Sequence, residues 1–239
     1  MEQPQQPQQQ LFHERLTKRR FTWGFALAVA LYFTWNATVV KNPEWSILAH
    51  IANDLIKCLP VVAAGIATWC ITGSVRWMPA ALLFSALGDL AGEHREFILQ
   101  IAMFAIAHIV YCVHFLQRTT FDKRAAILLA LLLLMVIVLG AFIIGRINND
   151  IEQICCSIYI VIIAAMAGSA ILHTSPYKWW NTLAALLFIF SDSCIAINRF
   201  VEHIPHAGVV IMSTYFAAQY IFARVYINEY YKSATCHRQ

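Results

Sequence analysis

The sequence predicts an all-α membrane protein, a polytopic bundle of eight transmembrane helices with both termini in the cytoplasm. Hydrophobic residues make up 60% of the 239 residues and charged residues only 13%, whereas soluble globular domains carry about 25% charged residues. Eight apolar stretches of about 20 residues follow one another, each long enough to cross the roughly 30 Å of bilayer hydrocarbon. They lie at 21–40, 47–71, 76–92, 97–117, 125–145, 152–173, 178–200 and 207–230.

The basic residues predict the orientation. With the N-terminus inside, twelve Lys and Arg residues lie on the inner side and four on the outer side, namely Lys41, Arg95, Arg146 and Arg199. Cytoplasmic loops carry the excess of basic residues, so both termini are predicted to be cytoplasmic. The remaining base, Lys57, lies within a span. Because the net charge of +4 is spread over loops, no nucleic-acid partner is expected.

The chain is expected to form one domain. Residues 1–14 are predicted to be a disordered Gln/Pro-rich tail, residues 15–232 the eight-helix membrane domain, and residues 233–239 a C-terminal tail. The basic start resembles a signal peptide, but the apolar run after it is too long and lacks a cleavage site, so it is interpreted as a retained helix. The seven cysteines form no C-x-x-C pair and are interpreted as packing residues.

Two spans are interpreted as scaffold. In 21–40, Tyr32, Trp35 and Asn36 near the outer end are typical of interfacial anchoring and packing. The span 125–145 contains no ionisable group and is expected to face lipid.

The span 47–71 carries a polar face. His50, Asn53, Asp54 and Lys57 are spaced three and four apart, so they share one side of a helix, and Pro60 is expected to kink it. Asp54 and Lys57 could form an internal ion pair. Alternatively, Lys57 could hold a positive charge at depth for an anionic substrate group or for the aspartates.

The span 76–92 presents Ser85 and Asp89 at i, i+4 on one face. Gly88 and Gly92 would let another helix or a ligand approach closely. An aspartate at membrane depth costs about 2.5–3.5 kcal/mol, so Asp89 is a functional-site candidate.

Three further spans offer polar groups at helical spacing. His108 and Tyr111 lie at i, i+3 in 97–117, Tyr159 lies in 152–173, and Tyr215 and Gln219 lie at i, i+4 in 207–230. Membrane helices use such groups as interhelical contacts, so each could be structural or functional.

The span 178–200 contains the second intramembrane aspartate, Asp192. Ser191 and Ser193 flank it, and Asn198 and Arg199 follow near the exit. Its cost at depth makes it, like Asp89, a functional-site candidate.

The polar groups of six spans fall at one depth. Counting 1.5 Å per residue from the outer ends places them roughly 5–16 Å below the outer surface. The six are Lys57, Asp89, His108, Tyr159, Asp192 and Tyr215. We therefore expect one polar pocket in the non-cytoplasmic half.

Two aspartates in such a pocket favour acid–base chemistry. Burial raises a carboxyl pKa and a neighbouring carboxylate raises one of the pair further, so the pair could share a proton, one acting as acid and the other as base or charge stabiliser. Glycosidases pass through an oxocarbenium-like transition state with two carboxyl groups. The same electronics suit the hydrolysis of a vinyl ether, whose protonation also gives an oxocarbenium ion.

Four stretches carry a resemblance to a known family. They are ALLFSALGDL at 81–90, His108-x-x-Tyr111, LLFIFSDSCIAINRF at 186–200 and STYFAAQ at 213–219. They resemble the lysoplasmalogenase family, multi-pass membrane hydrolases of bacteria and animals, over residues 47–230. The most specific piece is S-D-S-x-x-A-x-N-R-F at 191–200. Lys57-x-x-Pro60 resembles the Lys-Pro element of the family but has two residues inserted.

The resemblance implies eight helices and hydrolysis of the vinyl ether bond of lysoplasmalogens. The products would be a fatty aldehyde and glycerophosphoethanolamine or glycerophosphocholine. Asp89 and Asp192 would be the catalytic pair, without a cofactor. The other residues expected at the pocket are Lys57, Ser85, His108, Tyr111, Tyr159, Ser191, Asn198, Arg199, Tyr215 and Gln219, with Lys57 and Arg199 meeting the phosphate.

Two other functions fit the same residues. A proton-coupled transporter could use the aspartates as proton carriers, and a lipid-binding scaffold would need no chemistry. The expected partners are a lysophospholipid substrate and membrane lipids. The chain is expected to be a multi-pass integral membrane protein, located in the cytoplasmic membrane in a bacterium. No metal site is expected: the loop Glu202-His203-x-x-His206 lacks the H-x-x-x-H spacing of a zinc helix and contains Pro205.

Overall fold

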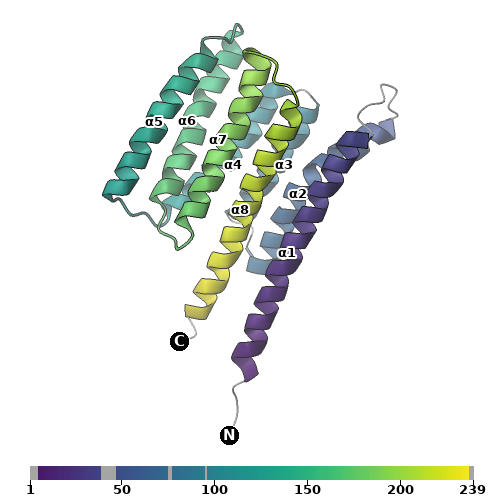
Figure 1. Cartoon of the computed structure of the whole chain (residues 1–239), viewed down its shortest axis with the longest axis vertical. Helices are drawn as coiled ribbons and strands as arrows, with labels where there is room; N and C mark the ends of the chain where they lie inside the picture. The colour runs from purple at the N-terminus through teal and green to yellow at the C-terminus, as the bar shows by residue number, and fades with distance from the viewer. Residues whose placement is uncertain (1–4, 39–46, 75–76, 95, 237–239) are drawn as a thin grey trace.

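The fold is an all-α bundle, as predicted. The computed structural model describes residues 5–38, 47–74, 77–94 and 96–236, and in these residues it contains eight helices and no strand (Figure 1). The helices are α1 Gln5–Thr38, α2 Ile47–Thr72, α3 Met78–Glu93, α4 Phe97–Leu116, α5 Lys123–Ile144, α6 Asp150–Leu172, α7 Lys178–Phe200 and α8 Ala207–Cys236.

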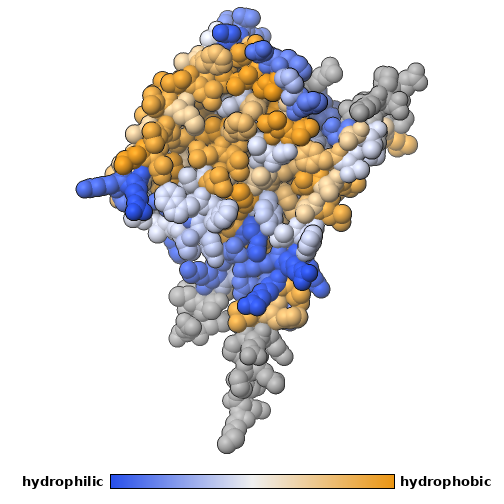
Figure 2. Space-filling model, in the orientation of Figure 1, coloured by the Kyte–Doolittle hydropathy of each residue, from blue (hydrophilic) through white to orange (hydrophobic). Residues whose placement is uncertain are grey.

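Six of the described helices, α2 and α4 to α8, are long and apolar enough to cross a membrane. The 16 residues of α3 span only about 24 Å, and polar and aromatic residues such as Trp23, Trp35 and Asn36 lower the hydropathy of α1. Eight crossings therefore stay a prediction. Figure 2 shows a wide apolar surface between hydrophilic regions at the two ends of the bundle, the pattern of a chain that spans a bilayer.

Two helices extend beyond residues 15–232, and the predicted domain limits stay a prediction. α1 begins at Gln5, inside the predicted tail, and α8 continues to Cys236. Residues 1–4 and 237–239 lie outside the described residues, as do Lys41, Arg76, Arg95 and Arg238 of the charge count. The start of α1 and the end of α8 lie at the same end of the bundle (Figure 1). Which side of the membrane this end faces stays a prediction.

The helices pack around a core rich in aromatic side chains. α3 packs against α2 and α4, α7 against α8, and α4 against α6. α1 lies against α2 and α8 at one edge, and α5 packs mainly against α6 at the other. Tyr111, Phe115, Phe188, Phe216 and Phe222 are fully buried at the centre. α5 keeps many large apolar side chains exposed, among them Leu131, Leu134 and Ile137, and these are available to lipid.

Two glycines set the distance between α3 and α4. A Cβ at Gly88 would lie 3.0 Å from the ring of Phe104, and one at Gly92 would lie 2.6 Å from the side-chain nitrogen of Gln100. The predicted close approach at these glycines is confirmed, and the partner is helix α4. Because α3 carries Asp89, this approach places Asp89 near the inward face of α4.

Candidate active site

Asp89 is buried between α3 and α8, with 4% of its surface exposed. The hydroxyl of Tyr215 donates a hydrogen bond to Asp89 Oδ2 over 2.7 Å. Ser85, one turn earlier on α3, is fully buried. The carboxylate of Asp89 is thus held by a hydrogen bond in a site that excludes most solvent.

A second tyrosine, Tyr111, joins α4 to the same face of α8. Its hydroxyl donates to Gln219 Oε1 over 2.7 Å, and both side chains are fully buried. Gln219 lies one turn after Tyr215, so the predicted i, i+4 pair points into the bundle from α8.

Asp192 has its own hydrogen-bonded group, built from α4, α6 and α7. The hydroxyl of Tyr159 donates to Asp192 Oδ2. His108 Nε2 lies 2.9 Å from the Tyr159 hydroxyl and 3.8 Å from Asp192 Oδ2. Because the single hydroxyl proton of Tyr159 is directed at Asp192, we infer that His108 Nε2–H is the donor to Tyr159. His108 Nδ1 is buried without a hydrogen-bond partner in the described residues.

Two phenylalanines connect the groups around Asp89 and Asp192. The ring of Phe188 lies 4.5 Å from that of His108 and 5.3 Å from that of Tyr215. The ring of Phe104 lies 5.9 Å from Tyr215 and 6.0 Å from Phe188. Both rings meet their neighbours edge to face, a favourable packing of aromatic pairs. The polar residues of five helices are therefore held in one packed unit.

An apolar cleft opens between α4, α5, α6 and α7, and Asp192 lines it. Asp192 is 13% exposed, more than Asp89, which is not among the lining residues. Tyr159 and Ser193 also line the cleft. The remaining lining is mostly apolar: Phe97, Gln100, Ile101, Phe104, Met135, Val136, Leu139, Gly140, Ile143, Cys156, Ile160, Ile163, Ile189, Ile195 and Ala196. The two aspartates thus differ in access.

Lys57 is bound by a carboxylate that the sequence analysis did not consider. Its ammonium lies 3.0 Å from Glu93 Oε2, and Asn53 donates to Glu93 Oε1 over 2.5 Å. Asp54 instead lies 3.1 Å from His94 Nε2. The internal Asp54–Lys57 ion pair is therefore absent from the described contacts, and Lys57 ties α2 to the end of α3. His50 was predicted on the same face, but its side chain is not among those that the structure describes.

Comparison with known proteins identifies the family. Residues 52–226 match the YhhN family. The chain belongs to the YhhN family. The lysoplasmalogenase TMEM86A of Bos taurus is 31% identical over 217 residues, which cover 83% of this chain and 85% of that protein. The lysoplasmalogenase TMEM86B of Mus musculus is 30% identical over 224 residues, covering 89% of each chain.

A bacterial relative extends the comparison. A lysoplasmalogenase of Mycobacterium tuberculosis is 30% identical over 152 residues, which cover 60% of this chain and 58% of that protein. No solved structure matches the chain. These relatives confirm the resemblance drawn from the sequence.

Three more of the predicted pocket residues of this YhhN-family chain, besides Lys57, have partners outside the aspartate groups. Ser191 donates to the carbonyl of Ile211 on α8 over 3.1 Å. Asn198 Oδ1 accepts from the backbone N–H of Ile204 over 2.9 Å and so shapes the α7–α8 loop. Arg199 lies 2.7 Å from Glu152 Oε1. These contacts stabilise helix ends and helix pairs.

Sequence reasoning about this YhhN-family chain missed two features of the site. Glu93 was not predicted, although it lies at i, i+4 from Asp89, a spacing that could have placed both carboxylates on one face of α3. The cleft was not predicted because its lining is as apolar as a lipid-facing surface. In addition, α5 forms one wall of the cleft, and the sequence of this helix had been interpreted as lipid-facing scaffold.

Proposed function

We propose that this chain is a membrane lysoplasmalogenase that hydrolyses the vinyl ether bond of lysoplasmalogens. The observation that carries the proposal is a carboxylate, Asp192, that accepts a hydrogen bond from Tyr159 and lines a mostly apolar cleft. The names of the YhhN-family relatives support the same reaction. The products are a fatty aldehyde and glycerophosphoethanolamine or glycerophosphocholine.

The cleft suits the substrate because a lysoplasmalogen has one long apolar chain whose vinyl ether adjoins the polar glycerol. The chain would lie against side chains such as Ile160 and Leu139, and burial of its CH₂ groups contributes about 0.8 kcal/mol each. The only acidic group that lines the cleft within the described residues is Asp192. The vinyl ether of the bound substrate would therefore lie beside this carboxyl group.

In the proposed mechanism Asp192 gives its proton to the carbon two bonds from the ether oxygen. The positive charge is then shared between the adjacent carbon and the oxygen, as in an oxocarbenium ion, and the Asp192 carboxylate stabilises it. Water adds to that carbon and returns a proton to Asp192. The resulting hemiacetal collapses to the aldehyde and the alcohol. Tyr159 occupies Oδ2, which leaves Oδ1 to carry the proton.

Asp89 supplies the second negative charge, although the rings of Phe104 and Phe188 separate it from the cleft. It acts together with Tyr215, which it fixes by a hydrogen bond of 2.7 Å, and with Tyr111 and Gln219, which brace α4 against α8. Lys57 and Arg199 are the proposed phosphate ligands. Each already binds a carboxylate, Glu93 or Glu152, so a phosphate would have to compete with that partner.

The proposal is tested by aldehyde release from lysoplasmenylethanolamine by the purified protein in detergent. We expect one aldehyde for each glycerophosphoethanolamine formed. The saturated ether analogue, which lacks the double bond to be protonated, should give none. A folded protein that releases no aldehyde would contradict the proposal, and proton-coupled uptake of a solute into vesicles would then favour the transporter.

The cleft can be tested by filling it. Ile160→Trp places a larger side chain on its α6 wall, so we expect the kcat/KM for a long-chain lysoplasmalogen to fall about tenfold or more. A short-chain substrate should be less affected. Ile158→Trp is the matched control on the same helix, because Ile158 does not line the cleft and is 57% exposed. Equal losses for both variants and both chain lengths would place the substrate chain elsewhere.

A further inference from the structure

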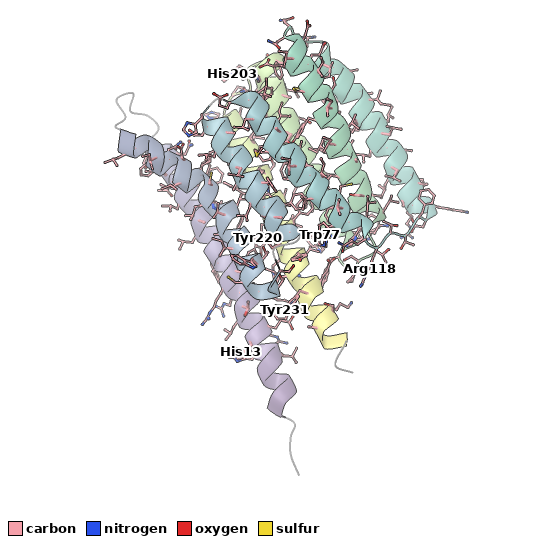
Figure 3. All side chains as sticks on the ribbon, turned by 180° about the vertical axis from the view of Figure 1, so that it is seen from behind. His13, Trp77, Arg118, His203, Tyr220 and Tyr231 are labelled. Atoms are coloured by element: carbon pink, nitrogen blue, oxygen red, sulfur yellow. The ribbon has the colours of Figure 1, made fainter. Side chains whose placement is uncertain are left out.

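A second cluster of ionisable side chains lies at the other end of the bundle. His114 is in the last turn of α4, His173 follows α6, and Glu229 is on α8. One ligand atom from each lies within 4.8 Å of the other two. Figure 3 labels one residue near each site: Arg118, just after the end of α4 that carries His114, and His203, in the loop after α7, the helix that carries Asp192. The two labelled residues lie at opposite ends of the bundle. The cluster is therefore distinct from the Asp89–Asp192 site.

The distances inside this cluster are too long for direct hydrogen bonds. His114 Nε2 lies 3.9 Å from Glu229 Oε2, and His173 Nε2 lies 3.7 Å from Glu229 Oε1. His114 has only 9% of its side chain exposed, yet neither ring nitrogen has a hydrogen-bond partner in the described residues. Buried polar groups normally find a partner, so an unpaired imidazole calls for an explanation such as an ion.

The neighbours orient the other two side chains toward the same point. His173 Nδ1 lies 2.8 Å from the carbonyl oxygen of Phe115, so it carries the proton and Nε2 is left to face the cluster. The hydroxyl of Ser175 donates to Glu229 Oε1. Imidazole and carboxylate ligands of metals are held by hydrogen bonds of this kind to a carbonyl or a hydroxyl, which fix the tautomer and the direction of the ligand.

We propose that His114, His173 and Glu229 bind a divalent metal ion of the zinc class. Two imidazole nitrogens and one carboxylate are a known zinc ligand set, with bonds of about 2.0–2.2 Å. In a tetrahedral site such bonds separate the ligand atoms by about 3.4 Å. The two histidine–glutamate distances, 3.9 and 3.7 Å, therefore need to close by a few tenths of an ångström, and no pair of ligand atoms by more than about 1.4 Å, because all lie within 4.8 Å of one another. Glu229 is 21% exposed, which leaves room for a water as the fourth ligand.

The ion would fasten three segments that are far apart in the sequence. Thr119 and His173 already form an isolated β-bridge, and a metal at His173 would tie this connection to α8. No spacing motif in the sequence could have predicted the site, because each ligand comes from a different segment. The prediction that the chain has no metal site was based only on local patterns such as Glu202-His203-x-x-His206.

The test is zinc binding by the full chain, purified in detergent through a tag without histidine. After saturation with zinc and exhaustive dialysis, we expect about one zinc per chain by elemental analysis. His114→Gln and Glu229→Gln should lose it, while the matched control His203→Gln, in the exposed α7–α8 loop, should keep it. Ser175→Ala, which removes only the outer hydrogen bond, should weaken zinc affinity about 10–100-fold.

A measurement on the unaltered chain covers variants that fail to fold. Replacing zinc with cobalt(II) should give the visible absorption of a four-coordinate ion with nitrogen and oxygen ligands. Zinc that is retained equally by His114→Gln and by the unaltered chain would overturn the proposal. So would an unaltered chain without bound zinc, which would leave His173 and Glu229 as an ion pair.

Discussion

Asp192→Asn is expected to lower aldehyde release from lysoplasmenylethanolamine by about 10²–10⁴-fold, the usual contribution of a general acid–base. The amide has nearly the same size as the carboxyl group and can still accept the Tyr159 hydrogen bond, but it has no proton to give to the vinyl ether carbon. It also carries no negative charge to stabilise the oxocarbenium ion. The measurement is kcat and KM for aldehyde formation by the purified variant.

The control for this variant is Asp150→Asn, at the exposed start of α6. It removes the same charge from the same bundle without touching the cleft, so its activity should equal that of the unaltered chain. Both variants should unfold at similar temperatures in detergent. An Asp192→Asn protein with more than about half of the original activity would exclude Asp192 as the general acid–base group.

The polar residues of this site could be predicted from the sequence because ionisable residues are rare in membrane helices. Asp89 and Asp192 stand out against their apolar neighbours, and helical spacing placed Ser85 beside Asp89 and Gln219 beside Tyr215 on single faces. The structure buries all of these except Asp192, which is partly exposed. A period of 3.6 residues thus carries much of the information about which polar groups face inward.

The pairing of those groups was not predictable, because it depends on how the helices pack. Lys57 has Asp54 three residues away on its own helix, yet it binds Glu93 of α3. Glu93 lies one residue beyond the predicted end of its span, 76–92, whereas α3 continues through it. Local spacing limits which groups can meet, whereas the choice among them is made by tertiary packing.

The same limit applies to the cluster of His114, His173 and Glu229. Each residue lies near the end of a helix, where an ionisable group is common and attracts no attention. Successive helices run antiparallel (Figure 1), so α4, α6 and α8 run in the same direction and the ends of α4 and α6 lie beside the later part of α8. A sequence can therefore predict a site on one or two helix faces far better than one assembled from three chain segments.

Asp89→Asn is expected to lower kcat by about 10²–10³-fold, as the loss of one preorganised electrostatic contact does, with little change in KM. Asp89 is outside the cleft lining, so substrate binding should not depend on it directly. Its charge would favour the transition state, in which positive charge develops on the substrate. The double variant Asp89→Asn/Asp192→Asn should be scarcely slower than Asp192→Asn alone, because groups that act on one step are not additive.

Glu93→Gln distinguishes this role from a structural one. Both changes remove a carboxylate from the same face of α3, but Glu93 is the direct partner of Lys57, at 3.0 Å. If Asp89 served only to balance the charge of Lys57, Glu93→Gln would reduce kcat at least as much as Asp89→Asn. If Asp89 acts on the reaction through the packed group that contains Tyr215, Glu93→Gln should retain most of the turnover, while Tyr215→Phe should share the loss of kcat.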